Sequence, residues 1–211
     1  GDRGYASVAG VDGTTVTAAA AQRTYRGSGR QVVERAAAYA VGGGQTEARK
    51  AAGQLLDAAE EHGFDRALAE HRARWARRWD EVDVRIPDDA SAELAVRYAL
   101  FQLWSHANDA QELALGARGL TGDGYAGHVF WDADVFVLPA MVSIDPAAAR
   151  AMVTYRLRRL SQARRNAHRQ GRRGARYPWE SAATGEDVTP AVGLLSGRAV
   201  PILTGVREEH V

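Results

Sequence analysis

Residues 119–136, GLTGDGYAGHVFWDADVF, are the most informative stretch for the fold, because a glycine-rich segment without periodicity leads directly into an apolar one. Helical patterns flank it: Ser91 to about Ala107, then residues 133–142, then a helix opened by Asp145-Pro146 and running to about Gln170. A second irregular stretch starts at Pro178. Helices that alternate with long, glycine-bearing loops predict a mainly α domain whose helix pairs gather their loops at one end.

The first 44 residues have a different pattern, which predicts β structure. Two short runs, residues 7–11 and 14–20, are separated by Asp12-Gly13, a strong hairpin signal. The run QVVERAAAYAV at residues 31–41 could close the sheet. Three consecutive glycines at residues 42–44 then end the pattern.

Residues 46–80 predict two helices. Thr46 is expected to cap the first helix, and His62-Gly63 to end it. The second helix, roughly residues 64–80, carries Trp75 and Trp79 at helical spacing, which is typical of core packing. The alternating run VDVRI at residues 82–86 predicts a short strand.

The composition excludes several classes of protein. The 211 residues include 27 basic and 26 acidic ones, so the formal net charge is +1, which gives no reason to expect nucleic acid or an acidic membrane as a partner. The absence of cysteine excludes disulfides, thiolate metal sites and cysteine nucleophiles. No apolar run approaches the ~20 residues of a membrane span, and residues 1–30 lack a signal-peptide layout. We therefore expect a cytoplasmic protein with no membrane segment.

Two irregular segments each place an indole beside a carboxylate. These pairs are Trp131-Asp132, and Trp179-Glu180 within GARYPWESAATGE, residues 174–186. A pyranose offers an apolar C–H face that stacks on an indole and hydroxyls that a carboxylate can accept. The alternative is that the tryptophans are core residues and the acids are helix caps or ion pairs. Two segments with the same chemistry favour a sugar site.

Other polar residues near these pairs have simpler explanations. His128 could bond a ligand, although a structural role is the commoner one for a lone histidine. Asp123 and Asp134 are expected to cap helices. The remaining histidines have no metal-ligand spacing, so no metal site is predicted. No phosphate-binding glycine loop or nucleophile elbow is present.

The same segments resemble the signature segments of glycoside hydrolase family 65, which includes maltose, kojibiose and trehalose phosphorylases, acid trehalases and related α-glucosidases. The resemblance is dense from about residue 98 to 211. It rests on Tyr98, Leu100–Leu103, Gly116–Gly122, Gly124-Tyr125, Gly127-His128, Phe130–Asp132, Leu138-Pro139, Pro146, Ala149-Arg150, Tyr155-Arg156, Tyr177–Ala182 and Gly185-Glu186.

The resemblance implies an (α/α)6 barrel preceded by a β-sandwich and a helical linker. Residues 1–44 would be the end of the sandwich, residues 45–89 the linker and residues 90–211 the first part of the barrel. In this family the general acid lies in a later segment, so no catalytic residue is expected before Val211. A chain that ends a few helices into a barrel would expose apolar helix faces, and we expect it to self-associate.

The resemblance also implies roles for the site residues. Trp131, Asp132, Trp179 and Glu180 would hold the glucosyl ring, with Glu180 a binding carboxylate and His128 a further ligand. Family members invert the anomeric carbon: a glutamic acid protonates the leaving oxygen, while phosphate or activated water attacks from the opposite face. No cofactor is expected, and inorganic phosphate would be a co-substrate only of a phosphorylase.

The choice between hydrolase and phosphorylase depends on few residues. Ala133-Asp134 follows Trp131-Asp132 where many phosphorylases have Thr-Glu, which favours a hydrolase. The segment SGRAVP, residues 196–201, lacks the His and Glu that maltose phosphorylases use there, so trehalose, kojibiose or another α-glucoside is preferred to maltose. A non-catalytic carbohydrate-binding fragment remains the alternative from another class, and a homodimer stays open.

Overall fold

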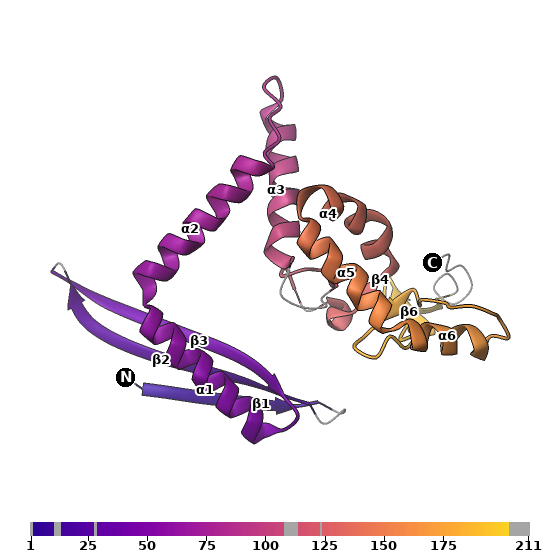
Figure 1. The fold of residues 1–211 in the computed structure, drawn as a ribbon, viewed down its shortest axis with the longest axis horizontal. Helices are drawn as coiled ribbons and strands as arrows, with labels where there is room; N and C mark the ends of the chain where they lie inside the picture. The colour runs from indigo at the N-terminus through magenta and orange to yellow at the C-terminus, as the bar shows by residue number, and fades with distance from the viewer. Residues whose placement is uncertain (1, 11–13, 28, 108–113, 123, 203–211) are drawn as a thin grey trace. The chain divides into compact units, whose positions relative to one another are not determined.

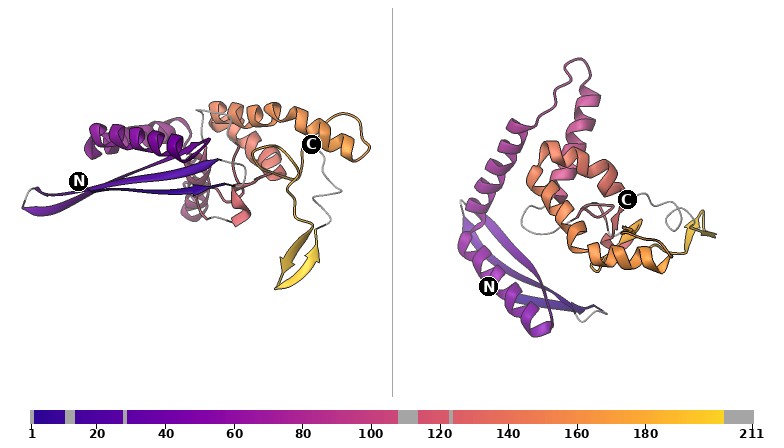
Figure 2. Two further views of the ribbon diagram at one scale, coloured as in Figure 1. Left: turned by 90° about the horizontal axis from the view of Figure 1, so that it is seen from below. Right: turned by 45° about the vertical axis from the view of Figure 1, so that its right-hand side comes forward.

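The computed structural model describes residues 2–10, 14–27, 29–107, 114–122 and 124–202. The chain divides into two compact units, Gly1–Glu81 and Val82–Val211, and each is described by itself (Figure 1, Figure 2). In the described residues, no helix is both long and apolar enough to cross a membrane.

The first unit is an antiparallel sheet with a helix packed on one face (Figure 1). Strands β1 (Asp2–Ala9), β2 (Thr15–Gly27) and β3 (Arg30–Gly42) lie in that order, and α1 (Gln45–His62) covers the sheet. Alternate residues of β2 point into the core, as the period of a strand requires. Small side chains let the helix approach closely, and the core consists of Ala19, Ala21, Ala38, Ala40, Ala52 and Leu56.

The structure confirms the predicted hairpin and both predicted helices of this unit. The turn at Asp12-Gly13 lies outside the described residues, and the strands are longer than expected. Thr46 is not the helix cap: the cap position is Gly44, without a side-chain bond, while the Glu47 carboxylate accepts the Gly43 N–H at 2.9 Å. Because glycine has no side chain that could cap the helix, the Glu47 side chain, from the first turn of the helix, accepts the Gly43 N–H instead.

The aromatic stripe of α2 (Phe64–Glu81) does not form a core. Trp75 and Trp79 stack on each other with ring centroids 6.2 Å apart, yet none of the described residues of α2 is fully buried. The prediction of core packing is therefore wrong within this unit. The stacking itself follows from the four-residue spacing, which places both indoles on one helix face.

The second unit is mainly helical. Its helices are α3 (Ala90–His106), α4 (Leu138–Ile144), α5 (Pro146–Arg158) and α6 (Leu160–Arg169), with a 3-10 turn η1 (Gly124–Gly127) and a π-helical turn η2 (Ala133–Val137). Short strands β4 (Val129–Phe130) and β5 (Glu180–Ser181) pair, as do β6 (Val192–Leu195) and β7 (Arg198–Pro201). An apolar cluster lies among the described residues of this unit and consists of Leu115, Val129, Ala133, Met141, Ala148, Ala149, Met152 and Tyr155.

Two expectations for this unit need correction. Residues 82–86 form no strand, because no partner strand is present among the described residues and the Glu93 carboxylate accepts the Ile86 N–H at 2.8 Å. The helix expected from residue 145 to 170 is interrupted at Arg159, which separates α5 from α6. Its predicted start is confirmed, with Pro146 in the first turn and the Asp145 carboxylate accepting the Ala148 N–H at 3.1 Å.

Candidate functional site

The two indole–carboxylate segments lie side by side, although they are almost 50 residues apart in the sequence. Strands β4 and β5 are antiparallel, with Val129 opposite Ser181 and Phe130 opposite Glu180. The pairing continues one residue further, because the Trp131 N–H donates to the Trp179 carbonyl at 2.9 Å. Backbone hydrogen bonds therefore fix the register in which the two pairs face each other.

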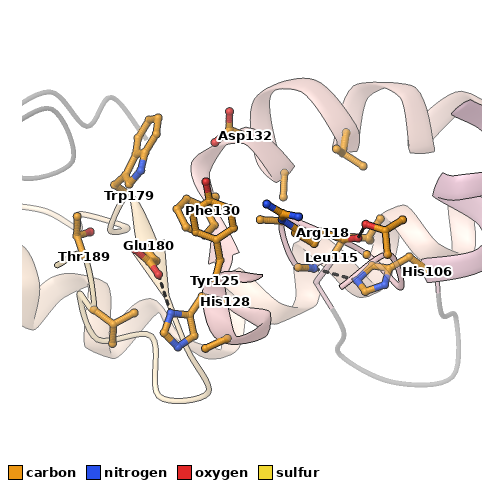
Figure 3. Close-up of a pocket in the computed structure, with 18 of the residues that line it drawn as sticks. His106, Leu115, Arg118, Tyr125, His128, Phe130, Asp132, Trp179, Glu180 and Thr189 are labelled. Atoms are coloured by element: carbon orange, nitrogen blue, oxygen red, sulfur yellow. Dashed lines mark hydrogen bonds and ion pairs between the residues drawn. The ribbon is translucent and has the colours of Figure 1, made fainter. Parts of the chain in front are cut away.

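A cavity of about 1100 Å³ opens beside this strand pair (Figure 3). Its walls come from α3, from the glycine-rich segment after it, from β4 and from the segment that follows Pro178. Polar and aromatic side chains from both predicted segments line it, namely Tyr125, His128, Phe130, Asp132, Trp179 and Glu180. The cavity thus combines an apolar lining with few polar groups, as small-molecule sites do.

Glu180 is a buried carboxylate that contacts His128. It is 7% exposed, and its Oε1 lies 2.7 Å from His128 Nδ1 (Figure 3). Burial of a carboxylate is costly unless hydrogen bonds compensate it, and His128 supplies one. Because an ionised carboxylate can accept several hydrogen bonds, Glu180 keeps capacity for a ligand. His128 therefore orients the acid on which a hydroxyl could dock.

Asp132 provides the second carboxylate of the cavity. Asp132 is exposed and occupies the N-cap position of η2, but its side chain makes no capping hydrogen bond. The alternative explanation, a helix cap, is therefore wrong for Asp132. In Figure 3 Asp132 and Glu180 lie apart, on different segments of the chain.

The two tryptophans have different positions. Trp179 lines the cavity, and Trp131 stacks against it with ring centroids 5.7 Å apart and planes 20° from parallel. The rings of Phe130 and Phe136 meet this pair edge-on. Trp131 is not one of the described residues that line the cavity, and its buried Nε1 has no hydrogen-bond partner among them. Trp131 therefore contacts the cavity-lining Trp179 and not the cavity itself.

Of the two acids expected to be helix caps, Asp134 is not a cap, and the prediction for Asp123 is untested. Asp123 lies outside the described residues. Asp134 turns away from the cavity and pairs with Arg156, whose Nη2 lies 2.6 Å from Asp134 Oδ2. Among the described residues no group of three histidine or acidic side chains could hold a metal ion.

Sequence patterns missed three lining residues on the side of α3. His106 accepts the Gly116 N–H at Nε2, 3.0 Å away, and burial lowers the pKa of His106. Arg118 lies over the ring of Tyr125 at 6.0 Å. Tyr125 itself has φ of +62°, a conformation that costs energy for a residue with a side chain and that concentrates at functional sites. Arg118 and Tyr125 lie in segments that carry the family resemblance, but nothing in the sequence indicated that these side chains would line a cavity, because the folding of the glycine-rich segment creates it.

The segment used to choose among the disaccharides, residues 196–201, lies in the β6–β7 hairpin. Ser196 and Gly197 both have positive φ at its turn, which suits a two-residue hairpin loop. Residues 196–201 are not among those that line the cavity, whereas the flanking Pro190 and Ile202 are.

Comparison with known proteins gives the family. Residues 97–211 match the model of the glycosyl hydrolase family 65 central catalytic domain, which is more than half of the chain. The chain belongs to glycosyl hydrolase family 65. The family resemblance expected from the sequence is thereby confirmed.

Several curated relatives and solved structures are similar to this family 65 chain. A kojibiose phosphorylase of Caldanaerobacter subterraneus is 44% identical over 71% of this chain and 20% of its own length. A kojibiose hydrolase of Mucilaginibacter mallensis is 38% identical over 64% of this chain and 20% of its own length. The solved "Putative kojibiose phosphorylase from human microbiome" has a TM-score of 0.78 at 22% identity, over 90% of this chain and 28% of that one. The chain thus spans about a fifth of the length of these curated relatives.

Proposed function

We propose that the full-length protein hydrolyses an α-linked glucoside, such as trehalose or kojibiose, and that this chain supplies part of the pocket for the glucosyl ring. One observation carries the proposal: the Trp179 indole and the carboxylates of Asp132 and Glu180 line a single cavity. An indole can stack on the C–H face of the sugar ring, while the two carboxylates accept hydrogen bonds from the hydroxyls of the sugar.

Each site residue has a proposed role in that pocket. Trp179 is the stacking platform, and Trp131 fixes its plane from behind. Glu180 accepts ring hydroxyls and is oriented by His128, which donates from Nδ1 when that nitrogen carries the proton. Asp132 binds hydroxyls from the opposite segment. These groups bind the donor sugar, and none of them is the proposed proton donor.

The proposed reaction inverts the anomeric carbon. A carboxylic acid protonates the leaving oxygen while a second group activates water on the opposite face of the ring. We assign these two catalytic groups to none of residues 1–211, in line with the expectation that they belong to a later segment. The proposed chemistry requires no metal and no organic cofactor.

We also propose that the units belong to a larger architecture. Residues 90–211 would form the first part of an (α/α)6 barrel, residues 45–89 a linker and residues 1–44 the end of a β-sandwich. The helical content of the second unit and the likeness to a solved structure at a TM-score of 0.78 support this assignment. On the sheet face opposite α1, a cross-strand row of exposed apolar residues, Val8, Val16 and Val41, suits a second sheet.

Phosphorolysis is the second candidate, with inorganic phosphate as the attacking co-substrate. It is favoured by the names of similar relatives, which include kojibiose phosphorylases and a trehalose 6-phosphate phosphorylase of Lactococcus lactis, 38% identical over 57% of this chain and 16% of its own length. The position that favours a hydrolase, Asp134, contacts Arg156 and not the cavity. Its influence on the attacking group must therefore be indirect.

One assay separates these candidates. The full-length protein is incubated with trehalose, kojibiose and maltose, with and without inorganic phosphate, and glucose and glucose 1-phosphate are separated. Equal glucose release without phosphate, with the transferred glucosyl unit appearing first as β-glucose by NMR, supports the inverting hydrolase; from trehalose, the leaving glucose appears as the α-anomer. Glucose 1-phosphate formed only with phosphate makes the protein a phosphorylase. No turnover of any substrate favours a non-catalytic carbohydrate-binding protein.

A further inference from the structure

A buried arginine connects the two segments of the site from behind. Arg156, on α5, is 8% exposed. Its Nε donates to both oxygens of Asp134, at 3.2 and 3.0 Å, and its Nη2 to Asp134 Oδ2 at 2.6 Å. Its Nη1 donates to Ser181 Oγ at 2.9 Å. One planar guanidinium therefore forms hydrogen bonds to both segments at once. One partner is Asp134, two residues after Asp132, and the other is Ser181, next to Glu180.

Two tyrosines strengthen the connection between α5 and the second segment. The Tyr155 hydroxyl lies 3.1 Å from Ser181 Oγ and donates to the Ala182 carbonyl at 2.7 Å. The Tyr177 hydroxyl donates to the Arg156 carbonyl at 3.1 Å. Ser181 is completely buried. The second segment is thus hydrogen-bonded to α5 on both sides of Trp179-Glu180.

The residues of this network do not line the cavity, but their immediate neighbours do. Asp132 and Ala133 line it, whereas Asp134 does not; likewise Glu180 lines it, whereas Ser181 does not. Two residues apart on a helix point in nearly opposite directions, and so do adjacent residues of a strand. Each backbone segment therefore presents a site residue on one side and a network residue on the other. A shift at Arg156 must move both sides together.

We propose that Arg156 is a positioning residue that sets the separation of Asp132 from Trp179-Glu180, and thereby the selectivity for glucosyl hydroxyls. The inference rests on the proposed function. Arginine suits this role because its rigid fork bonds to a carboxylate and a hydroxyl at once, whereas lysine is a point charge on a flexible stem. Arg156 itself touches no substrate.

The test compares Arg156→Lys with wild type in the full-length protein. It measures kcat/KM for the disaccharide that the wild type cleaves and for its 2-, 3-, 4- and 6-monodeoxyglucosyl analogues. A site that binds a hydroxyl rejects the analogue that lacks it. The discrimination ratio of each analogue is kcat/KM for the parent disaccharide divided by kcat/KM for that analogue. We expect Arg156→Lys to reduce the largest of these ratios at least about tenfold, toward 1. Arg169→Lys, an exposed change on α6, is the control and should leave every ratio unchanged.

A purely structural role gives a different result. Loss of folded enzyme lowers kcat/KM for all substrates by the same factor, so the ratios stay constant. Ratios in Arg156→Lys within twofold of wild type overturn the inference, whatever the loss of activity. If Arg156→Lys does not fold, Ser181→Ala serves, because it removes one buried hydroxyl and no charge; it should lower the same ratio, and an unchanged ratio overturns the inference. A wild type that cleaves none of the disaccharides overturns the proposed function and this inference with it.

Discussion

At the scale of single residues, Glu180→Gln tests whether this acid binds the sugar or donates the proton. Hydrogen bonds to charged groups contribute about 1.5–3 kcal/mol, so neutralising Glu180 should lower kcat/KM roughly 10- to 150-fold. As a binding residue it should leave the alkaline limb of the pH–rate profile in place. Disappearance of that limb would make Glu180 the general acid. Glu186→Gln, an exposed acid six residues later, is the matched control.

His106 gives a prediction for the pH dependence of stability. Burial lowers the pKa of His106, so the folded state favours the neutral imidazole. The stability that neutral His106 contributes to the folded state is fully present above the unfolded pKa of about 6.5. This stability is lost as the pH falls from there toward the lower pKa of the folded state. His106→Gln keeps an acceptor for the Gly116 N–H and removes the titration. Its melting temperature should fall less than that of wild type between pH 8 and 5. A fall parallel to that of the wild type would contradict the prediction.

The sequence indicated residues for a sugar site, and their roles stay predictions. Four of them line the cavity, namely His128, Asp132, Trp179 and Glu180, whereas Trp131 does not. Trp131-Asp132 and Trp179-Glu180 were recognised because an indole can stack on a sugar ring and a neighbouring carboxylate can accept hydrogen bonds from its hydroxyls. That Trp131 stacks behind Trp179 depends on the register of β4 against β5, which pairs segments about 50 residues apart. The pairing of Asp134 with Arg156 is equally non-local. Contacts of this kind leave no local pattern.

At the scale of elements, the N-cap of α5 offers a test of the helix that carries Arg156. Asp145 Oδ1 accepts the Ala148 N–H, and Pro146 occupies the first turn. Loss of an N-cap side chain costs about 1 kcal/mol. Asp145→Ala should lower the melting temperature, measured by circular dichroism, while Asp145→Asn should retain most of the stability because it keeps the acceptor. Equal losses in the two variants would show that another contact of Asp145 matters more.

Elements with local signals were predicted, and those that need a distant partner were not. The proline and aspartate at the start of α5 are local, and this helix start is confirmed. Residues 82–86 alternate as a strand does, but a strand needs a neighbour, and the Glu93 side chain accepts the Ile86 N–H instead. The break at Arg159 has no proline or glycine to signal it, and the Nε of Arg159 donates to the carbonyl of Ala183, in a distant segment, at 2.7 Å.

At the scale of the whole molecule, the exposed face of α3 predicts how residues 1–211 behave by themselves. Leu94, Tyr98 and Phe101 are 70%, 58% and 42% exposed, and their spacing places them on one helix face. Exposed apolar surface of this kind favours association. Light scattering after size exclusion should therefore give a mass above the 22.7 kDa of one chain. Replacing all three residues with glutamine should lower that mass.

The first unit supplies the comparison needed to locate the associating surface. Val8 and Val41 are 72% and 68% exposed on the uncovered face of its sheet. If α3 drives association, glutamine at these two positions should leave the measured mass unchanged, while the α3 triple variant approaches 22.7 kDa. If the valine variant becomes monomeric and the α3 variant does not, the sheet face is responsible. A monodisperse, cooperatively melting monomer of the unaltered chain would contradict both, because it would show that neither face has enough apolar area to associate.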